Sequence, residues 1–293
     1  IIVAPESEDI CWISRHPVRG EFRLHHAPLH PARQLAETLF QPKRSVILTS
    51  ATLQIESSFE YVRERLGLAV RYRELAVGSP FDYRRAALVY VTTDLPEPNS
   101  PNYAQTLHRA VIDLARATRG RMLVLLTSKS QLRAAYRAIS DPLANDGIVV
   151  LGQYMDGGRR QLLERFKTIE RCVLLGTQSF WEGVDVPGPA LSCLVIARLP
   201  FPVPSDPIFS ARSESYDDPF FQYAVPQTVI RFRQGFGRLI RSREDRGLVA
   251  LLDSRVSTKS YGSIFLNSLP AADIRFGLCR DLPPLAERWL AEE

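Results

Sequence analysis

Metal-ligand clusters, long apolar runs and internal repeats are all lacking from this sequence. Its four cysteines are spread over the chain with no pair at metal-ligand spacing, and Cys172 and Cys193 fall within apolar, strand-like runs. Cysteine in such runs is usually a small buried hydrophobe. The longest apolar stretches, such as Met122 to Leu126, fall far short of the roughly 20 residues that span a bilayer. We therefore expect a protein without membrane spans that resides in a reducing cytoplasm.

The start of the chain lacks the marks of a secreted protein. Ile1 stands in place of methionine, and the stretch from Ile1 to Pro5 has neither the charged start nor the long apolar segment of a signal peptide. We therefore expect a fragment of a longer polypeptide. Its 293 residues suffice to bury a full core, as one large domain or two small ones.

Neither sign of charge dominates the chain, but the basic residues are unevenly distributed. The 37 lysines and arginines exceed the 32 acidic residues by five, and the pI is about 9.1. That excess mildly favours an anionic partner such as nucleic acid. Six arginines fall within the sixteen residues from Arg231 to Arg246, so this segment requires a specific explanation.

From about residue 85 onward, short apolar runs alternate with helical stretches, which is typical of an α/β fold with a parallel sheet. Each run is continuous and bounded by polar residues or glycine, as expected of strands covered on both faces. The expected strands are Ala87–Thr92, Met122–Thr127, Ile148–Leu151, Cys172–Gly176, Leu191–Ala197 and Leu248–Leu252. The expected helices are Tyr103–Ala117, Lys129–Ile139, Arg159–Ile169 and Pro226–Ile240. We predict a doubly wound sheet with helices on both faces.

The first 80 residues have a different pattern. The expected elements are strands at Ile10–Ile13, Phe22–Leu24 and Ser45–Ser50 and a helix at His30–Leu39. We treat residues 1–80 as a lead-in segment and residues 81–293 as the sheet domain. The stretch from Ile1 to Arg44 either packs on that domain or belongs with a preceding one.

The arginine-rich segment carries a pattern suited to a nucleotide phosphate. Gln234, Arg238 and Arg241 recur at i, i+4 and i+7, which predicts that they share one face of a helix. Gly235 and Gly237 are each costly in a helix interior, by roughly 1 kcal/mol, which indicates close packing against them. A guanidinium fork stabilises the negative charge that phosphoryl transfer spreads over the γ-phosphate oxygens. The alternative is a surface helix with a solvated basic face.

Several motifs in this chain resemble those of one family. The segment Gln234–Arg241 (QGFGRLIR) matches the Q-x-x-G-R-x-x-R form of helicase motif VI, and GTQSFWEGVD resembles motif V. SVILTSATL from Ser45, SPFDY from Ser79, VLLTSKSQL from Val124 and LLDSRVSTKSYGSIFLNSLP from Leu251 resemble further segments, in the order of the family. The matches extend over most of the chain. It therefore resembles the C-terminal motor domain of the DinG/XPD-like (Rad3-related) superfamily 2 DNA helicases, which implies a RecA-like fold.

The resemblance implies a role for each matching residue. Arg238 would be the arginine finger that faces the γ-phosphate of ATP, with Arg241 beside it and Gln234 helping to orient both. The nucleotide cleft would include Glu182, Gly183 and Asp185. DNA phosphates would be held through hydroxyls, backbone N–H groups and one charge by Thr127, Ser128, Lys129 and Thr177. The ATP state would be coupled to the grip on DNA by Ser50 and Thr52. Finally, Phe180 or Trp181 either stacks on a base or packs in the core.

Most of an ATP site is missing from the sequence. The nearest approach to a Walker A loop, Gly152–Arg159, has Gly158 where the lysine belongs, and no Asp-Glu-Ala-His-like box is present. The resemblance therefore implies that the N-terminal helicase domain of the same polypeptide binds ATP and Mg²⁺. An iron–sulfur cluster, which some family members carry, would also lie upstream, because the cysteines here are not clustered. A metal site could be suggested by His25, His26 and His30, but no further ligand is evident.

We expect the intact protein to be an ATP-dependent DNA helicase that binds single-stranded DNA. The family resemblance implies unwinding in the 5′ to 3′ direction, in DNA repair or in the resolution of unusual DNA structures. The fragment alone should be inactive, because an arginine finger without a nucleotide site has nothing to stabilise. One alternative is a non-catalytic nucleic-acid-binding domain of the same fold. Another, a nucleotide enzyme complete in itself, is disfavoured by the missing Walker A loop.

Overall fold

The computed structural model describes residues 9–16, 19–55, 58–68, 72–181, 186 and 188–291. The chain divides into two compact units. The first, called the hairpin unit here, comprises Ile1–Ala76 and Phe201–Ile230, and the second, the sheet unit, comprises Val77–Pro200 and Arg231–Glu293. Each unit is therefore built from two separate stretches of sequence.

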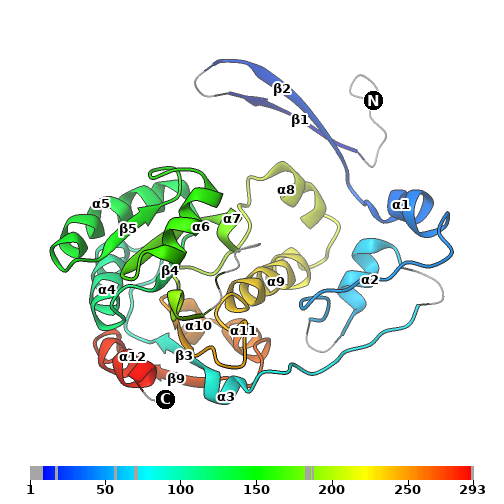
Figure 1. Cartoon of the computed structure of the whole chain (residues 1–293). Helices are drawn as coiled ribbons and strands as arrows, with labels where there is room; N and C mark the ends of the chain where they lie inside the picture. The colour runs from blue at the N-terminus through cyan, green and yellow to red at the C-terminus, as the bar shows by residue number, and fades with distance from the viewer. Residues whose placement is uncertain are drawn as a thin grey trace. The chain divides into compact units, whose positions relative to one another are not determined.

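A seven-stranded parallel sheet forms the centre of the sheet unit (Figure 1). Its strands lie in the order β5-β6-β4-β7-β8-β3-β9, and every neighbouring pair is parallel. They are β3 (Ala87–Thr92), β4 (Met122–Leu125), β5 (Val149–Gly152), β6 (Cys172–Gly176), β7 (Cys193–Ile196), β8 (Gly247–Leu251) and β9 (Asp273–Gly277). Six of them are predicted strands and are confirmed. The seventh, β9, escaped prediction because it pairs only with β3 and is partly exposed, so it lacks the continuous apolar run of a buried strand.

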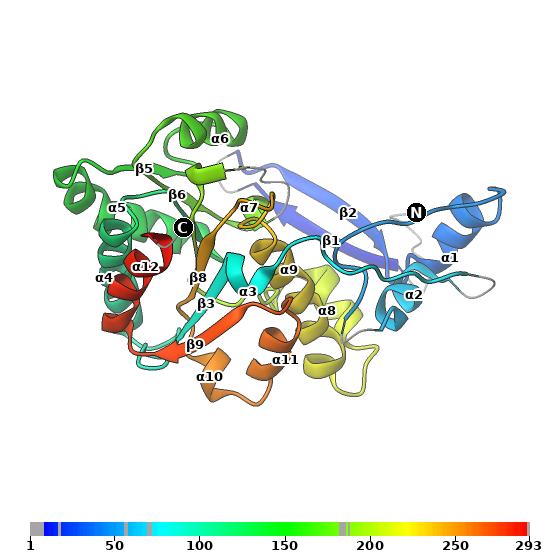
Figure 2. The ribbon, with the colours of Figure 1, turned by 60° about the horizontal axis from the view of Figure 1, so that its bottom comes forward.

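Helices cover both faces of this sheet, as predicted. One face is covered by α4 (Tyr103–Ala117), α5 (Lys129–Asn145) and α12 (Leu282–Ala291), and Figure 2 shows α4 and α12 side by side. The other face is covered by α6 (Arg159–Thr168), α7 (Gln178–Trp181) and the end of α9 (Val225–Phe236). Connections between consecutive parallel strands are right-handed. Along the chain, β3, β4 and β5 follow one another toward one side of the sheet, and β6 to β9 follow one another back toward the other side. The connecting helices therefore lie on one face before β5 and on the opposite face after it.

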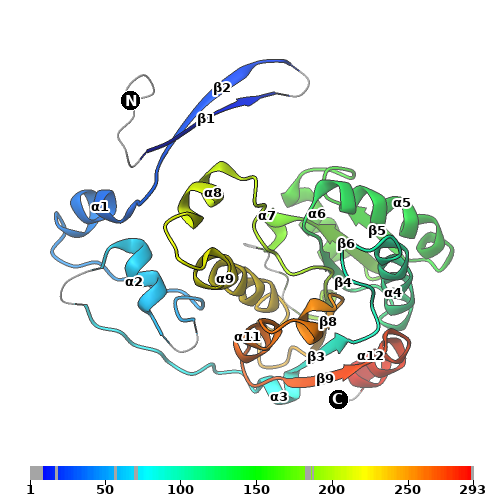
Figure 3. The same cartoon turned by 180° about the vertical axis from the view of Figure 1, so that it is seen from behind.

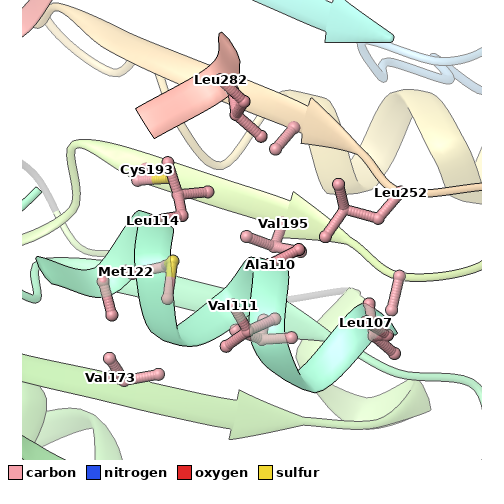
Figure 4. Close-up of a cluster of buried hydrophobic side chains, with 14 of the residues drawn as sticks. Leu107, Ala110, Val111, Leu114, Met122, Val173, Cys193, Val195, Leu252 and Leu282 are labelled. Carbon is pink, nitrogen blue, oxygen red and sulfur yellow. The ribbon is translucent and has the colours of Figure 1, made fainter. Parts of the chain in front are cut away.

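Alternate strand residues bury the first face of the sheet against α4 (Figure 4). Leu107, Val111 and Leu114 recur at helical spacing along α4, and each is at most 3% exposed. They pack with strand side chains such as Val173 and Val195, which are fully buried. Removal of this apolar surface from water stabilises the unit, by about 25 cal/mol per Å². The packed layer holds the strands, and hence their ends, in fixed positions.

The arginine helix is shorter than predicted. It ends at Phe236 instead of Ile240, and tight turns with i to i+3 hydrogen bonds follow it. Two glycines lie at this end, and each costs roughly 1 kcal/mol in a helix relative to alanine, which accounts for the early termination. Arg238 and Arg241 therefore lie beyond the helix, and the prediction that they share one helical face with Gln234 is wrong.

The hairpin unit is built on two antiparallel strands and several short helices (Figure 3). The pairing of β1 (Asp9–Arg15) with β2 (Phe22–Pro28) confirms two predicted strands. The other elements are α1 (Ala32–Leu35), which continues as the π-helix η1 (Ala36–Phe40), α2 (Glu60–Leu66), α8 (Pro207–Ser213) and the π-helix η3 (Phe220–Ala224). Buried Tyr223 stacks on Phe209 and Tyr216, with ring centres 5.3 and 5.2 Å apart. These aromatic contacts join α8 to η3.

The predicted strand at Ser45–Ser50 is wrong. This segment has no regular secondary structure, and the side chain of Ile47 is 89% exposed. A strand needs a neighbour that satisfies its backbone N–H and C=O groups, and no strand within the described ranges pairs with this segment. Its sequence nonetheless has the apolar run of a buried strand.

Two of the three histidines that suggested a metal site, His25 and His26, are engaged within the hairpin. His25 stacks on Trp12 with ring centres 4.7 Å apart and lies 2.7 Å from the hydroxyl of Ser14. His26 lies 2.9 Å from the carboxylate of Asp9. Across the described residues, no group of three or more His, Cys, Asp or Glu is placed to hold a metal ion. Within the same ranges, no helix has both the length and the apolar character needed to cross a membrane.

Replacement of Leu114 by alanine should lower the free energy of unfolding by roughly 2 to 5 kcal/mol, because the truncation leaves a cavity in the core. The side chain is fully buried. Urea denaturation followed by circular dichroism measures the change. Gln105→Ala, at an exposed position on the same helix, is the matched control and should change stability by less than about 0.5 kcal/mol. Equal losses in the two variants would contradict the packing of α4.

Candidate functional site

The C-terminal ends of the parallel strands meet at one edge of the sheet, where binding residues of such folds gather. Three of the predicted DNA-binding residues, Thr127, Ser128 and Lys129, come just after β4. Thr177 follows β6, the strand that pairs with β4. The structure therefore brings all four residues to the same edge, on neighbouring strands.

Tyr154 connects two of these residues. It lies in the loop after β5, and its hydroxyl is 3.3 Å from Oγ1 of Thr177. The Nζ of Lys129 lies 4.7 Å from the centre of the Tyr154 ring, which is a cation–π contact. The tyrosine is 48% exposed, and its φ of 70° is unusual and costly for an aromatic residue. An exposed aromatic ring thus lies between an ammonium group and a hydroxyl at the strand ends.

Gln153 fixes the position of Thr177. Its Oε1 accepts hydrogen bonds from the backbone N–H of Thr177, at 2.8 Å, and from its hydroxyl, at 2.9 Å. The Nε2 of Gln153 donates to the hydroxyl of Ser179 at 2.8 Å. Thr177 is only 5% exposed. It therefore shapes this edge of the sheet more than it offers surface to a ligand.

The N-terminus of α5 is suited to an anion. Ser128 caps the helix, because its Oγ accepts from the backbone N–H of Gln131 at 3.2 Å. With its amide oriented so that both ends find partners, Gln131 donates from Nε2 to Oγ1 of Thr127 at 3.0 Å and accepts at Oε1 from Nε of Arg198 at 2.6 Å. Thr127 and Lys129 are exposed. Since α5 has 17 residues, its dipole and its first N–H groups favour negative charge at this end.

A buried carboxylate organises the adjoining strand ends. Asp253 follows β8 and accepts hydrogen bonds from Nε and Nη2 of Arg255, at 2.9 and 2.6 Å, and from the backbone N–H of Leu199, at 2.8 Å. Because Leu199 belongs to the loop after β7, Asp253 ties that loop to the loop after β8. In the loop after β7, the guanidinium of Arg198 lies 4.6 Å from the centre of the Tyr103 ring. Sequence reasoning missed Asp253, because nothing in LLDSR marks a carboxylate that bonds to a loop distant in sequence.

The three residues predicted to act on ATP lie at the end of α9 and just beyond it. The Nε of Arg238 donates to the backbone carbonyl of Trp181 at 3.2 Å. The backbone N–H of Arg241 donates to the carboxylate of Asp245 at 2.6 Å. The amide oxygen of Gln234 is buried and has no hydrogen-bond partner among the residues that the structure describes. The Arg238 guanidinium is therefore held by a side-chain contact, the main chain at Arg241 is held by a backbone contact, and the glutamine retains an acceptor for a further donor.

Close packing explains Gly235, as predicted, but the same prediction is wrong for Gly237, where the nearest atom of the described residues would lie 3.4 Å from a Cβ. A Cβ at this position would lie 2.8 Å from the ring of Trp181 and 3.3 Å from the side chain of Leu125. Trp181 is 3% exposed and Phe180 is fully buried. Core packing, one of the two alternatives for these aromatic residues, is thereby confirmed, and neither ring offers a surface on which a base could stack.

Five other predicted roles stay predictions. Glu182, Gly183 and Asp185 fall outside the described residues, so their place at a nucleotide cleft stays a prediction. Ser50 and Thr52 belong to the hairpin unit, where their hydroxyl oxygens are 3.2 Å apart. Their coupling role also stays a prediction.

Residues 111–272 match a family model described as a helicase C-terminal domain. The chain is 35% identical over 280 residues to the 3′-5′ exonuclease DinG of Bacillus subtilis, covering 92% of this chain and 30% of that protein. It is 37% identical over 263 residues to the ATP-dependent DNA helicase YoaA of Escherichia coli, covering 88% and 40%. It is 38% identical over 276 residues to the ATP-dependent helicase DinG of Mycobacterium tuberculosis, covering 91% and 41%. The chain thus spans less than half the length of these relatives.

Two solved structures are similar to this chain. One, titled XPD_Helicase, has a TM-score of 0.67 at 20% identity, and the match includes 88% of this chain and 47% of the chain in that structure. The other, titled XPD_APO, has a TM-score of 0.62 at 18% identity and covers 88% and 53%. At such low identity the likeness establishes the fold alone, and it confirms the predicted RecA-like architecture.

Gly235→Ala should destabilise the protein by about 1 to 3 kcal/mol, because overpacking against Trp181 outweighs the gain of roughly 1 kcal/mol in helix propensity. Gly237→Ala is the matched control, since its Cβ would meet the backbone carbonyl oxygens of Arg233 at 3.4 Å and of Gln234 at 3.8 Å, both ordinary contact distances. That variant should be as stable as the wild type or slightly more so. Urea titration monitored by tryptophan fluorescence compares the two. Wild-type stability in Gly235→Ala would show that Trp181 does not pack against this helix.

Proposed function

We propose, because the chain belongs to the DinG/XPD-like family of helicase C-terminal domains, that it forms the second half of an ATP-driven DNA motor. In this proposal it supplies the arginine finger and part of the DNA track, and a preceding domain of the same polypeptide supplies most of the ATP site. The observation that supports the proposal best is the grouping of Lys129, Tyr154 and Thr177 beside the N-terminus of α5.

This grouping suits a single strand of DNA. The ammonium group of Lys129 and the N-terminus of α5 both attract a backbone phosphate. The exposed ring of Tyr154 can stack on an unpaired base of any identity. A duplex keeps its bases stacked on one another, so the ring favours a single strand. Neither contact reads sequence, which suits a motor that steps along any DNA, and the 5′ to 3′ direction is inferred from the family resemblance.

The arginine finger is assigned to Arg238, with Arg241 beside it. The contact with the Trp181 carbonyl restricts the orientation of the Arg238 guanidinium, so less ordering is needed when a γ-phosphate arrives. The buried amide oxygen of Gln234 can accept from a guanidinium and so help to orient it. In the proposal, Glu182, Gly183 and Asp185 border the same nucleotide, and Ser50 and Thr52 couple its state to the grip on DNA.

The remaining cofactors would be bound mainly outside this chain. Mg²⁺ and most of the ATP contacts would come from the preceding domain, because a Walker A lysine is missing from this sequence. The cysteines here do not fit an iron–sulfur cluster, since Cys172 and Cys193 are buried in different strands and no cluster of ligands occurs among the described residues. Any such cluster would therefore belong to another domain.

In a polypeptide that joins this chain to a Walker-motif domain, Arg238→Ala should slow DNA-stimulated ATP hydrolysis by about 10³- to 10⁵-fold, the usual effect of an arginine finger. Arg243→Ala, at an exposed position five residues later, is the control and should leave the rate unchanged. Steady-state ATPase assays at saturating DNA provide the comparison. A normal rate in Arg238→Ala would rule this residue out as the finger. Robust DNA-stimulated ATP hydrolysis by the 293-residue chain alone would refute the proposal that a preceding domain supplies most of the ATP site.

Tyr154→Leu should weaken binding of single-stranded DNA by about 1 to 3 kcal/mol, the value of one base–aromatic stack. Tyr154→Phe keeps the ring and loses only the hydroxyl contact with Thr177, so it should retain most of the affinity. Fluorescence anisotropy measures binding to an oligonucleotide and to its abasic counterpart. The abasic strand should bind wild type and Tyr154→Leu equally. If Tyr154→Leu lost equal affinity for the intact and the abasic oligonucleotide, stacking of a base on Tyr154 would be contradicted.

A further inference from the structure

A second candidate binding surface lies at the opposite edge of the sheet, where the strands begin. A cleft of about 730 Å³ is lined there by residues that precede β4, β6 and β7, chiefly Arg119, Arg121, Lys167 and Arg171. The strands between the two edges have four or five residues, and each residue advances a strand by about 3.3 Å. The cleft is therefore separated from the edge that carries Lys129 by roughly 15 Å of packed sheet.

The cleft carries an excess of positive charge. Four cationic side chains line it against one carboxylate, that of Glu170. Among the described residues, Arg119, Arg121 and Arg171 form no ion pair. Lys167 lies 3.7 Å from the carboxylate of Glu164, and water screens such an exposed pair. The protein itself therefore leaves most of this charge without a counterion.

Two of these arginines occupy backbone positions that disfavour a side chain. Arg119 and Arg121 have φ angles of 54° and 47°, on either side of Gly120 at 76°. Packing requires the turn, because a Cβ at Gly120 would lie 2.5 Å from the backbone nitrogen of Cys172. Glycine or asparagine adopts a positive φ at lower cost than arginine. The geometry of the turn therefore does not account for arginine at both flanking positions.

Backbone phosphates are the ligand that fits this lining. Guanidinium and ammonium groups bind phosphate oxygens well. The apolar lining is limited to Ile169 and Ala190, so the cleft lacks the aromatic anchor typical of a peptide-binding pocket. We infer that the cleft is a second nucleic-acid site, which binds the phosphates of a strand or duplex flanking the strand held at the opposite edge. The inference rests on the proposed DNA function for the identity of that flanking nucleic acid.

The double variant Arg119→Asn/Arg121→Asn tests this site. Asparagine tolerates a left-handed backbone, so both charges are removed without strain and the thermal stability should not fall. Binding to a single strand of about 30 nucleotides and to a duplex of about 20 base pairs is measured by anisotropy over a range of salt concentrations. The slope of log K against log salt should become shallower by about 0.7 per lost phosphate contact for the single strand, or about 0.9 for the duplex. The nucleic acid whose slope changes is the one that supplies the phosphates.

Arg137→Gln/Arg288→Gln removes two exposed charges elsewhere on the sheet unit and is the matched control. An unchanged slope in the asparagine variant, or an equal change in the control, would overturn the second site. Lys129→Ala probes the opposite edge in the same assay. If Lys129→Ala leaves binding intact while the asparagine variant weakens binding, the proposed DNA site at the strand ends is refuted and the site in the cleft is supported. A chain that binds neither nucleic acid contradicts both.

Discussion

Parallel strand pairing is the constraint on which both candidate surfaces depend. Because all seven strands run in one direction, every strand ends at one edge of the sheet and begins at the other. Lys129 and Tyr154 lie just beyond the ends of strands, and Arg121 and Arg171 lie just before the starts of strands. A fully buried layer between the sheet and α4 holds the two edges apart. The positions of the two surfaces therefore follow from strand direction and not from any one side chain.

Most of the sheet unit could be predicted from sequence because five of its seven strands are buried along their whole length. Cys172–Gly176, for example, is a continuous apolar run that is fully buried in the fold. Prediction failed where a segment depends on a neighbour. Ser45–Ser50 has the run of a buried strand without a partner in the described ranges, whereas Asp273–Gly277 lacks that run and becomes a strand by pairing with β3. An apolar run shows that a segment is suited to burial, but pairing with a neighbour decides whether it is buried as a strand.

The residues of the candidate site likewise fall into two groups, those that the sequence could locate and those that it could not. Lys129 and Arg238 could be located because they belong to motifs of fixed local spacing. Gln153, Tyr154 and Asp253 could not, because they act through loops far apart in sequence: Gln153 bonds to a residue 24 positions away, and Asp253 to one 54 positions away. Such contacts leave no periodic trace in a single sequence. The residues that hold the site together are thus the ones that only the fold reveals.

The early end of α9 changes how the proposed arginine finger is held. A side chain on a helix is oriented by the helix, whereas Arg238 lies in a turn and is oriented by the carbonyl of Trp181. The ring of Trp181 can occupy its place only because Gly235 has no side chain. Trp181 also lies immediately before the predicted nucleotide-cleft residues. Trp181 therefore packs against α9 through its ring and contacts the Arg238 guanidinium through its carbonyl, so helix packing and the orientation of the proposed finger both depend on one residue.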